Sequence, residues 1–164
     1  MNSALLIESL DLQGMQELAS QLVKSLPKRV SIGLRGTLGA GKTTLVQAIS
    51  AEIGVDRADV TSPTFTLLQS HHGSDQVLHH LDAYRVADED EFLELGVEEL
   101  FDQERAWTLI EWADRVADVM PPNTLWMEIR IEPQPDTRSV KLWTADHELS
   151  QVLRTALREM MAKG

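Results

Sequence analysis

A glycine-rich segment that ends in lysine and threonine constrains the fold of this chain more than any other feature. It spans residues 36–43, reads GTLGAGKT, and fits the pattern G-x-x-x-x-G-K-[ST] at every fixed position. Gly36, Gly39 and Gly41 allow successive backbone N–H groups to turn inward around a phosphate chain, and the dipole of a following helix adds positive potential. The segment therefore predicts a phosphate-binding loop (P-loop) between a strand and a helix.

The segments on both sides of the loop favour this interpretation over a plain glycine-rich turn. Residues 29–35 alternate in part and contain β-branched residues, which is typical of a strand. After the loop, Leu45, Ala48 and Ile49 recur at helical spacing. Gly54 then indicates where that helix ends. Strand, loop and helix follow one another in the order that phosphate binding needs.

The end of the loop and two later acidic residues predict a Mg²⁺ site. Lys42 is expected to reach the β- and γ-phosphates, and Thr43 to place its hydroxyl on Mg²⁺. A carboxylate at the end of an apolar strand normally completes such a site. Both Asp82 and Glu111 qualify, although a solvated acid at a strand end is the alternative for either one alone. The expected metal ligands are therefore Thr43, Glu111 and Asp82.

The carboxylates of Asp82 and Glu111 are expected to have different roles. Glu111 ends the more apolar strand, of the kind found at the centre of a sheet, and we assign it to the Mg²⁺ shell. By alternation along its own strand, Asp82 shares a face with His80 and Tyr84. We therefore expect Asp82 to position the attacking water or a switch segment.

A proline-containing segment provides the candidate switch. Pro63 fixes the chain in an extended turn, so that Thr64 could hold its hydroxyl toward the γ-phosphate or the attacking water. An ordinary strand start with proline at its edge is the alternative. Catalytic roles are expected for Lys42, Asp82 and Thr64.

Length and composition predict one α/β domain. A chain of 164 residues buries roughly 70% of its unfolded surface, enough for a three-layer core, so we expect a single P-loop ATPase domain over residues 1–164. The chain contains no cysteine, which suits a reducing cytoplasm. Residues 1–8 lack a signal-peptide pattern, and no segment reaches the ~18 apolar residues of a membrane span. A cytoplasmic protein without a membrane partner is expected.

The other patterns predict a mixed sheet with helices around it. Strands are expected over about residues 62–70, 76–84, 106–110, 125–131 and 138–143. Helices are expected over about residues 12–26 and 147–161, and one or two short ones between residues 88 and 102. Hairpin turns at 73–75 and 133–136 make some strand pairs antiparallel. The predicted fold class is therefore α/β, a P-loop NTPase-like three-layer fold with a mixed parallel and antiparallel sheet.

Taken in order, four of these motifs resemble the TsaE family. They are residues 36–43, 62–67, 80–85 and 110–112, and the resemblance covers about residues 10–145. It implies a P-loop α/β domain and a bacterial ATPase. It further implies that the ATPase is required with TsaB and TsaD for the threonylcarbamoyladenosine modification at position 37 of tRNAs that read codons beginning with A. ATP and Mg²⁺ are the cofactors implied.

The resemblance also implies roles for single residues. It implies phosphate binding by Lys42 and Mg²⁺ binding by Thr43 and Glu111. Four further residues are implied at or near the nucleotide: Thr64, Asp82, Tyr84 and Trp112. The expected nucleotide contacts are Gly36, Thr37, Leu38, Gly39, Ala40, Gly41, Lys42, Thr43, Thr44 and Trp112. Thr37 stands where family members usually have Asp or Glu, so we assign it no catalytic role. Family members contact adenine near the position of Leu12, where no residue is assigned.

Other nucleotide-dependent functions are weighed against the ATPase. A GTPase would need an Asn/Thr-Lys-x-Asp segment, and no lysine of this chain is followed two residues later by Asp. A small-molecule kinase or a non-enzymatic ATP-dependent switch stays open as an alternative. Asp82 is followed by Ala83 and not by the glutamate that many fast ATPases use. Slow turnover that rises when a partner completes the site is therefore expected.

The charge balance predicts that tRNA is reached only through partner proteins. The chain has 26 acidic and 15 basic residues, a formal charge of −11, whereas proteins that grip RNA usually present a basic face. A local patch of arginines stays open as an alternative. The acidic residues from Asp88 to Glu99 form a candidate docking face for a basic partner, or a merely solvated helix face. TsaD and TsaB are the partners that the resemblance implies.

Overall fold

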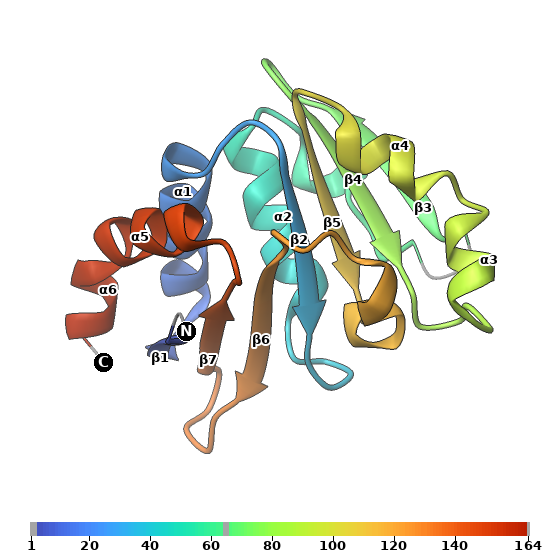
Figure 1. The fold of residues 1–164 in the computed structure, drawn as a ribbon. Helices are drawn as coiled ribbons and strands as arrows, with labels where there is room; N and C mark the ends of the chain where they lie inside the picture. The colour runs from blue at the N-terminus through green and yellow to red at the C-terminus, as the bar shows by residue number, and fades with distance from the viewer. Residues whose placement is uncertain (1–2, 64–65, 164) are drawn as a thin grey trace.

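One mixed β-sheet runs through the whole molecule (Figure 1). The structure, a computed structural model, describes residues 3–63 and 66–163. Within these residues seven strands lie in the order β1-β7-β6-β2-β5-β4-β3. Their bounds are β1 (Leu5–Leu10), β2 (Val30–Arg35), β3 (Leu68–His72), β4 (Val77–Asp82), β5 (Ala106–Glu111), β6 (Leu125–Ile131) and β7 (Arg138–Trp143).

The strand directions confirm the mixed sheet expected from the sequence. At the centre, β2 pairs in parallel with β5 and β6, and β4 pairs in parallel with β5. At the edges, β3 pairs antiparallel with β4, and β7 pairs antiparallel with β6 and β1. Every residue of β5 is buried, as its apolar sequence predicts for a central strand.

Helices cover both faces of the sheet. They are α1 (Leu12–Ser25), α2 (Lys42–Glu52), α3 (Glu89–Leu93), α4 (Val97–Asp102), α5 (His147–Ala156) and α6 (Arg158–Ala162), with short 3-10 helices η1 (Arg57–Asp59) and η2 (Ala113–Val119). The side chain of Asp11 begins α1 by accepting a hydrogen bond of 2.7 Å from the Gly14 N–H. None of the helices in the described part of the chain is long and apolar enough to cross a membrane.

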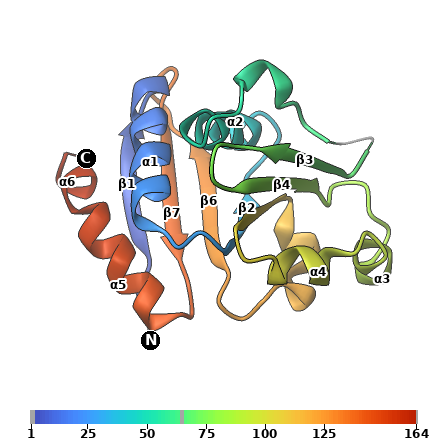
Figure 2. The same ribbon diagram turned by 90° about the horizontal axis from the view of Figure 1, so that it is seen from above.

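Two apolar clusters show that the molecule has three layers (Figure 2). One cluster joins α1, α2 and α5 to one face of the sheet, and the other joins α3, α4 and η2 to the opposite face. Neighbouring residues of β5 alternate between them, because Leu109 belongs to the first cluster and Ile110 to the second. The P-loop NTPase-like architecture predicted from the sequence is confirmed.

Three parts of the fold differ from the sequence expectations. The strand expected over about residues 62–70 begins only at Leu68, as β3, because the positive φ of 65° at Leu67 interrupts an extended backbone just before it. No strand was expected over residues 5–10, yet β1 pairs with β7, where Leu5 lies opposite Leu142 and Ile7 opposite Val140. This strand forms because a sheet edge supplied by the opposite end of the chain accepts it. The closing helix expected over residues 147–161 is divided into α5 and α6 at Leu157, whose backbone leaves helical geometry.

Candidate functional site

The glycine-rich loop connects β2 to α2 and needs glycine for two physical reasons. Gly41 has φ of 110°, a left-handed conformation that side chains disfavour, and it directly precedes the first residue of α2. A Cβ atom on Gly36 would lie 2.7 Å from the carbonyl oxygen of Ile129. The loop therefore combines a special backbone turn with close packing against β6, and it lies at the N-terminus of a helix.

Lys42 points back into the loop from the start of α2. Its side chain is almost fully buried, and Nζ donates hydrogen bonds of 2.7 Å to the Gly36 carbonyl and 3.0 Å to the Thr37 carbonyl. The ring centroid of Trp112 lies 4.0 Å from Nζ. An ammonium group has three donors, and carbonyls of the described residues use two of them.

Burial and nearby charges have opposite effects on the pKa of Lys42. Burial lowers the pKa of the Lys42 ammonium below its ordinary value. Three carboxylates raise it in part, and they belong to Glu111, Asp82 and Asp114. The loop thus holds a buried cation close to several anions, which is a typical environment for phosphate and metal binding.

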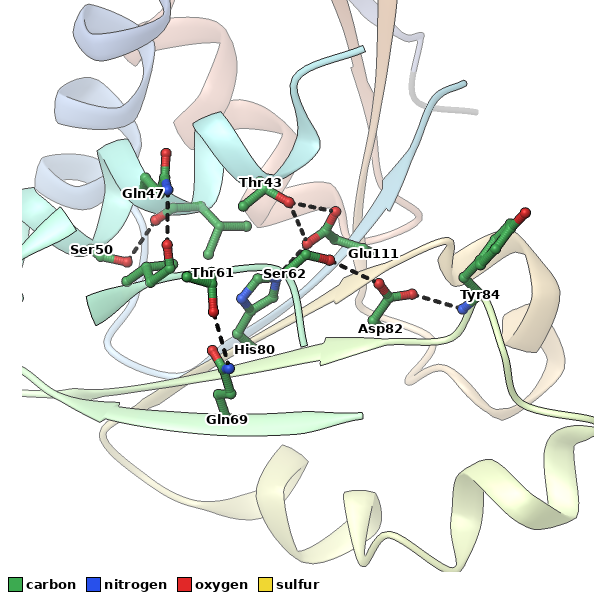
Figure 3. A network of polar contacts seen from close by, with 12 residues as sticks. Thr43, Gln47, Ser50, Thr61, Ser62, Gln69, His80, Asp82, Tyr84 and Glu111 are labelled. Atoms are coloured by element: carbon green, nitrogen blue, oxygen red, sulfur yellow. Dashed lines mark hydrogen bonds and ion pairs between the residues drawn. The ribbon is translucent and has the colours of Figure 1, made fainter. Parts of the chain in front are cut away.

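Glu111 and Thr43 lie in direct contact beside the loop (Figure 3). The Thr43 hydroxyl is 3.1 Å from Oε1 and 3.0 Å from Oε2 of Glu111, a residue that is only 3% exposed. The parallel pairing of β2 and β5 produces this contact, because it sets Leu34, one residue before the end of β2, opposite Glu111. A hydroxyl and a carboxylate provide the oxygen ligands that Mg²⁺ prefers.

Asp82 ends the neighbouring strand and takes part in different contacts (Figure 3). It lies opposite Glu111 in the register of β4 and β5. Its Oδ2 accepts a hydrogen bond of 3.1 Å from the Ser62 hydroxyl, and its Oδ1 accepts one of 2.8 Å from the Tyr84 N–H. The three expected metal ligands are thus brought together, with Glu111 in contact with Thr43 and Asp82 in contact with the segment that precedes the candidate switch.

Thr64 and Trp112 were also expected at the site. Thr64 lies outside the described residues, so its role as a switch residue stays a prediction. Trp112 follows Glu111 directly and has a left-handed backbone with φ of 59°, which is uncommon for a residue with a side chain. Its ring lies over Lys42 and contacts the ring of Tyr84, with 4.9 Å between the two ring centroids. The aromatic pair therefore borders the loop.

Hollows on both sides of the loop have room for a nucleotide. One of about 540 Å³ is lined by loop residues, both carboxylates and Trp112. A second, also about 540 Å³, lies by the start of α2, where Ala40, Gly41 and Thr44 form one wall. Its other residues were not assigned from the sequence: Leu10, Asp11, Leu12, Gln13, Met15, Asp136 and Arg138.

The second hollow depends on contacts that no local pattern indicates. Arg138 begins β7, and its Nε donates a hydrogen bond of 2.8 Å to the carbonyl of Ala40, 98 positions earlier in the chain. The only hint in the sequence was the family's adenine contact near Leu12.

A third hollow of about 680 Å³ lies against Gly36, Thr37 and Trp112 on the side of β6.

The loop after β2, the helix that follows it and the carboxylates at the ends of adjacent parallel strands define a P-loop NTPase-like protein. The crystal structure of YdiB from Bacillus subtilis has the same fold, with a TM-score of 0.77 over 97% of both chains at 22% sequence identity.

Sequence comparisons identify the family. The profile described as "Threonylcarbamoyl adenosine biosynthesis protein TsaE" matches residues 9–140. The tRNA threonylcarbamoyladenosine biosynthesis protein TsaE of Treponema pallidum is 38% identical over 98 residues, which cover 60% of this chain and 70% of that protein. The Haemophilus influenzae protein of the same name is 32% identical over 115 residues, 70% of each chain. The chain therefore belongs to the TsaE family, which takes part in tRNA threonylcarbamoyladenosine biosynthesis, and the resemblance stated above is confirmed.

Proposed function

We propose that this protein binds ATP and hydrolyses it slowly as an accessory of tRNA threonylcarbamoyladenosine formation. The observation that carries the proposal is the contact of Thr43 with Glu111, at 3.0 and 3.1 Å, beside a loop into which Lys42 points. Membership of the family connects this site to the tRNA modification.

The residues of the site fit ATP and Mg²⁺. The loop would surround the phosphates, with the third donor of Lys42 directed to the β- and γ-phosphates. The hollow next to Leu12 and Arg138 offers space for the nucleoside. Mg²⁺ held by Thr43 and Glu111, with Asp82 close by, would neutralise charge on the phosphate oxygens.

The residues at the end of β4 suggest why hydrolysis is slow without help. Asp82 is held from two sides, by the Ser62 hydroxyl and the Tyr84 N–H, so its carboxylate is well placed to orient water. It is the only acidic residue of β4, and Ala83 follows it where many fast ATPases have a glutamate. We infer that Thr64 and a partner protein complete the site and raise the rate.

We propose TsaB and TsaD as the partners, tRNAs that read codons beginning with A as the substrate reached through them, and the cytoplasm as the location. Family membership and the formal charge of −11 support this arrangement. A cysteine-free chain also suits a reducing compartment.

Phosphate release from ATP and from GTP tests the proposal. Wild-type protein should release phosphate slowly from ATP, and Lys42→Ala should lower the rate by roughly 100-fold or more because it removes the cation that contacts the transferred phosphate. Lys28→Ala is the matched control, since Lys28 pairs with Asp75 at the other end of β2. TsaB and TsaD should raise the wild-type rate.

Four results would contradict the proposal or select an alternative. Normal turnover in Lys42→Ala, or equal affinity for ATP and GTP, would exclude the proposed ATPase site. ADP formation that depends on an added small-molecule acceptor would identify a kinase. ATP binding without any hydrolysis, alone or with both partners, would identify a non-enzymatic switch.

A further inference from the structure

A fully buried histidine lies directly behind the carboxylate that we assign to Mg²⁺ (Figure 3). His80 of β4 is 0% exposed, and its Nε2 lies 2.5 Å from Oε2 of Glu111. Because an ionised carboxylate can only accept a hydrogen bond, Nε2 carries the proton in this contact. We propose that His80 is a positioning residue, which holds the Glu111 carboxylate in the orientation that binds Mg²⁺; this inference rests on the proposed function.

The sheet places the histidine behind the carboxylate and not beside it. In the parallel register of β4 and β5, His80 lies opposite Leu109 and Asp82 lies opposite Glu111. The imidazole therefore reaches Glu111 from two positions farther back in the sheet, on the face that also carries Asp82. Thr43 contacts the same carboxylate from the side of the loop. Two donors from different elements thus hold Glu111, and both would be needed to fix its orientation.

The surroundings of the other ring nitrogen of His80, Nδ1, indicate that the contact with Glu111 explains why a histidine stands at this position. Among the described residues, no hydrogen-bond partner lies within reach of His80 Nδ1, although the atom is buried. Such an orphaned polar atom is costly, and an apolar side chain of similar size would avoid the cost. A histidine that only filled space would therefore be a poor choice at this position, whereas one that anchors Glu111 gains a short hydrogen bond to a charged group.

The preceding residue provides an internal comparison. His79 is 5% exposed and lies on the opposite face of the same strand. Both of its nitrogens have partners, since Nδ1 is 2.8 Å from the Ser70 hydroxyl and Nε2 is 2.8 Å from Oε1 of Gln103. His79 has the hydrogen bonding expected of a structural histidine, and His80 does not.

Three substitutions of His80 distinguish a positioning role from a space-filling role. The amide nitrogen of His80→Gln can reach Glu111 much as Nε2 does, His80→Asn is one methylene too short, and His80→Leu keeps volume without a donor. We would titrate each variant with Mn²⁺ in the presence of ADP and measure the concentration of free Mn²⁺ by electron paramagnetic resonance. Loss of a group that orients a metal ligand typically weakens metal affinity by about 10- to 100-fold. His80→Asn and His80→Leu should show such a loss, and His80→Gln should stay within about threefold of wild type.

His79→Leu is the matched control, because it changes another buried histidine on the same strand and should leave Mn²⁺ affinity unchanged while lowering the unfolding temperature. Wild-type Mn²⁺ affinity in folded His80→Asn or His80→Leu, or an equal loss in His80→Gln and His80→Asn, would overturn the inference. If His80→Leu does not fold, the comparison of the two amides decides. Failure of the wild-type protein to bind ADP and Mn²⁺ at all would instead refute the proposed function, and with it the positioning role.

Discussion

Lys42 is almost completely buried although its side chain carries a charge. Burial lowers its pKa, and the nearby carboxylates do not fully compensate. The folded chain therefore binds this proton less tightly than the unfolded chain, whose lysine has the ordinary pKa of 10.5. At pH values below both pKa values the charged lysine opposes folding to its full extent. As the pH rises through the folded pKa toward the unfolded one, this unfavourable contribution becomes smaller.

The nucleotide-free protein should show this dependence. We expect the free energy of unfolding of wild type, minus that of Lys42→Met, to increase from pH about 7 to pH about 10. Urea denaturation of both proteins at several pH values measures the difference, and the subtraction cancels the titration of groups common to both. A difference that stays constant or decreases with pH would show that the loop carbonyls and Trp112 hold the lysine fully charged.

The two carboxylates should respond differently to loss of charge. Glu111 contacts Thr43, so Glu111→Gln should raise the Mg²⁺ concentration for half-maximal hydrolysis by about tenfold or more. Asp82 is held by Ser62 and Tyr84, so Asp82→Asn should lower the rate at saturating Mg²⁺ by about 100-fold. Hydrolysis rates measured over a Mg²⁺ titration distinguish the two effects. The opposite pattern would exchange the assigned roles.

Among the elements, α3 and α4 carry the acidic stretch, and their capping decides which acids are free to meet a partner. The carboxylate of Asp88 accepts a hydrogen bond of 2.8 Å from the Glu91 N–H, and that of Glu91 accepts one of 2.6 Å from the Ala87 N–H. These two acids therefore hold the start of α3. Asp90, Glu94 and Glu98 are exposed, as is the capping residue Asp88. The stretch is a structural cap and an exposed acidic surface at once.

Reversing the exposed acids tests whether this surface docks. The triple change Asp90→Lys, Glu94→Lys and Glu98→Lys should weaken binding to a TsaB–TsaD complex by about tenfold or more, since opposite charges across an interface become like charges. ATP affinity should not change, because the surface belongs to the opposite side of the sheet from α2. Calorimetry or light scattering measures both. Unaltered assembly would leave these residues as a solvated helix face.

For the molecule as a whole, the distribution of positive charge bears on tRNA binding. Several basic residues are already paired within the chain, since Lys28 and Arg105 contact Asp75, and Arg130 contacts Glu128. Arg35 and Lys141 both lie over the ring of Trp143, with 5.9 and 5.6 Å to its centroid. This group of two cations is small compared with the formal net charge of −11 on the whole chain.

The isolated protein should therefore bind tRNA weakly. We expect no complex at micromolar protein in a gel-shift titration at ~0.15 M salt, where charge interactions extend about 8 Å. Addition of TsaB and TsaD should bring the protein onto tRNA. Micromolar binding by the protein alone would contradict the accessory role, and its loss in Arg35→Glu or Lys141→Glu would locate the tRNA on the β7 side of the sheet.

The sequence alone was enough to predict the P-loop, the strand before it, the helix after it, the mixed sheet and the two acidic strand ends. These features depend on residue types at short, regular spacings, and backbone geometry links such spacings directly to local structure. The prediction that Thr43, Asp82 and Glu111 are site residues followed from the same local rules.

Only the tertiary structure decided which of these residues meet. β1 is a strand because β7 offers it an edge, and the hollow beside Leu12 exists because Arg138 reaches Ala40. Glu111 contacts Thr43 and His80 because β5 lies between β2 and β4, an order that no pattern within a single strand records. The side-chain hydrogen bonds among these contacts join residues 31 to 98 positions apart, where pairing depends on strand order and register and not on local spacing.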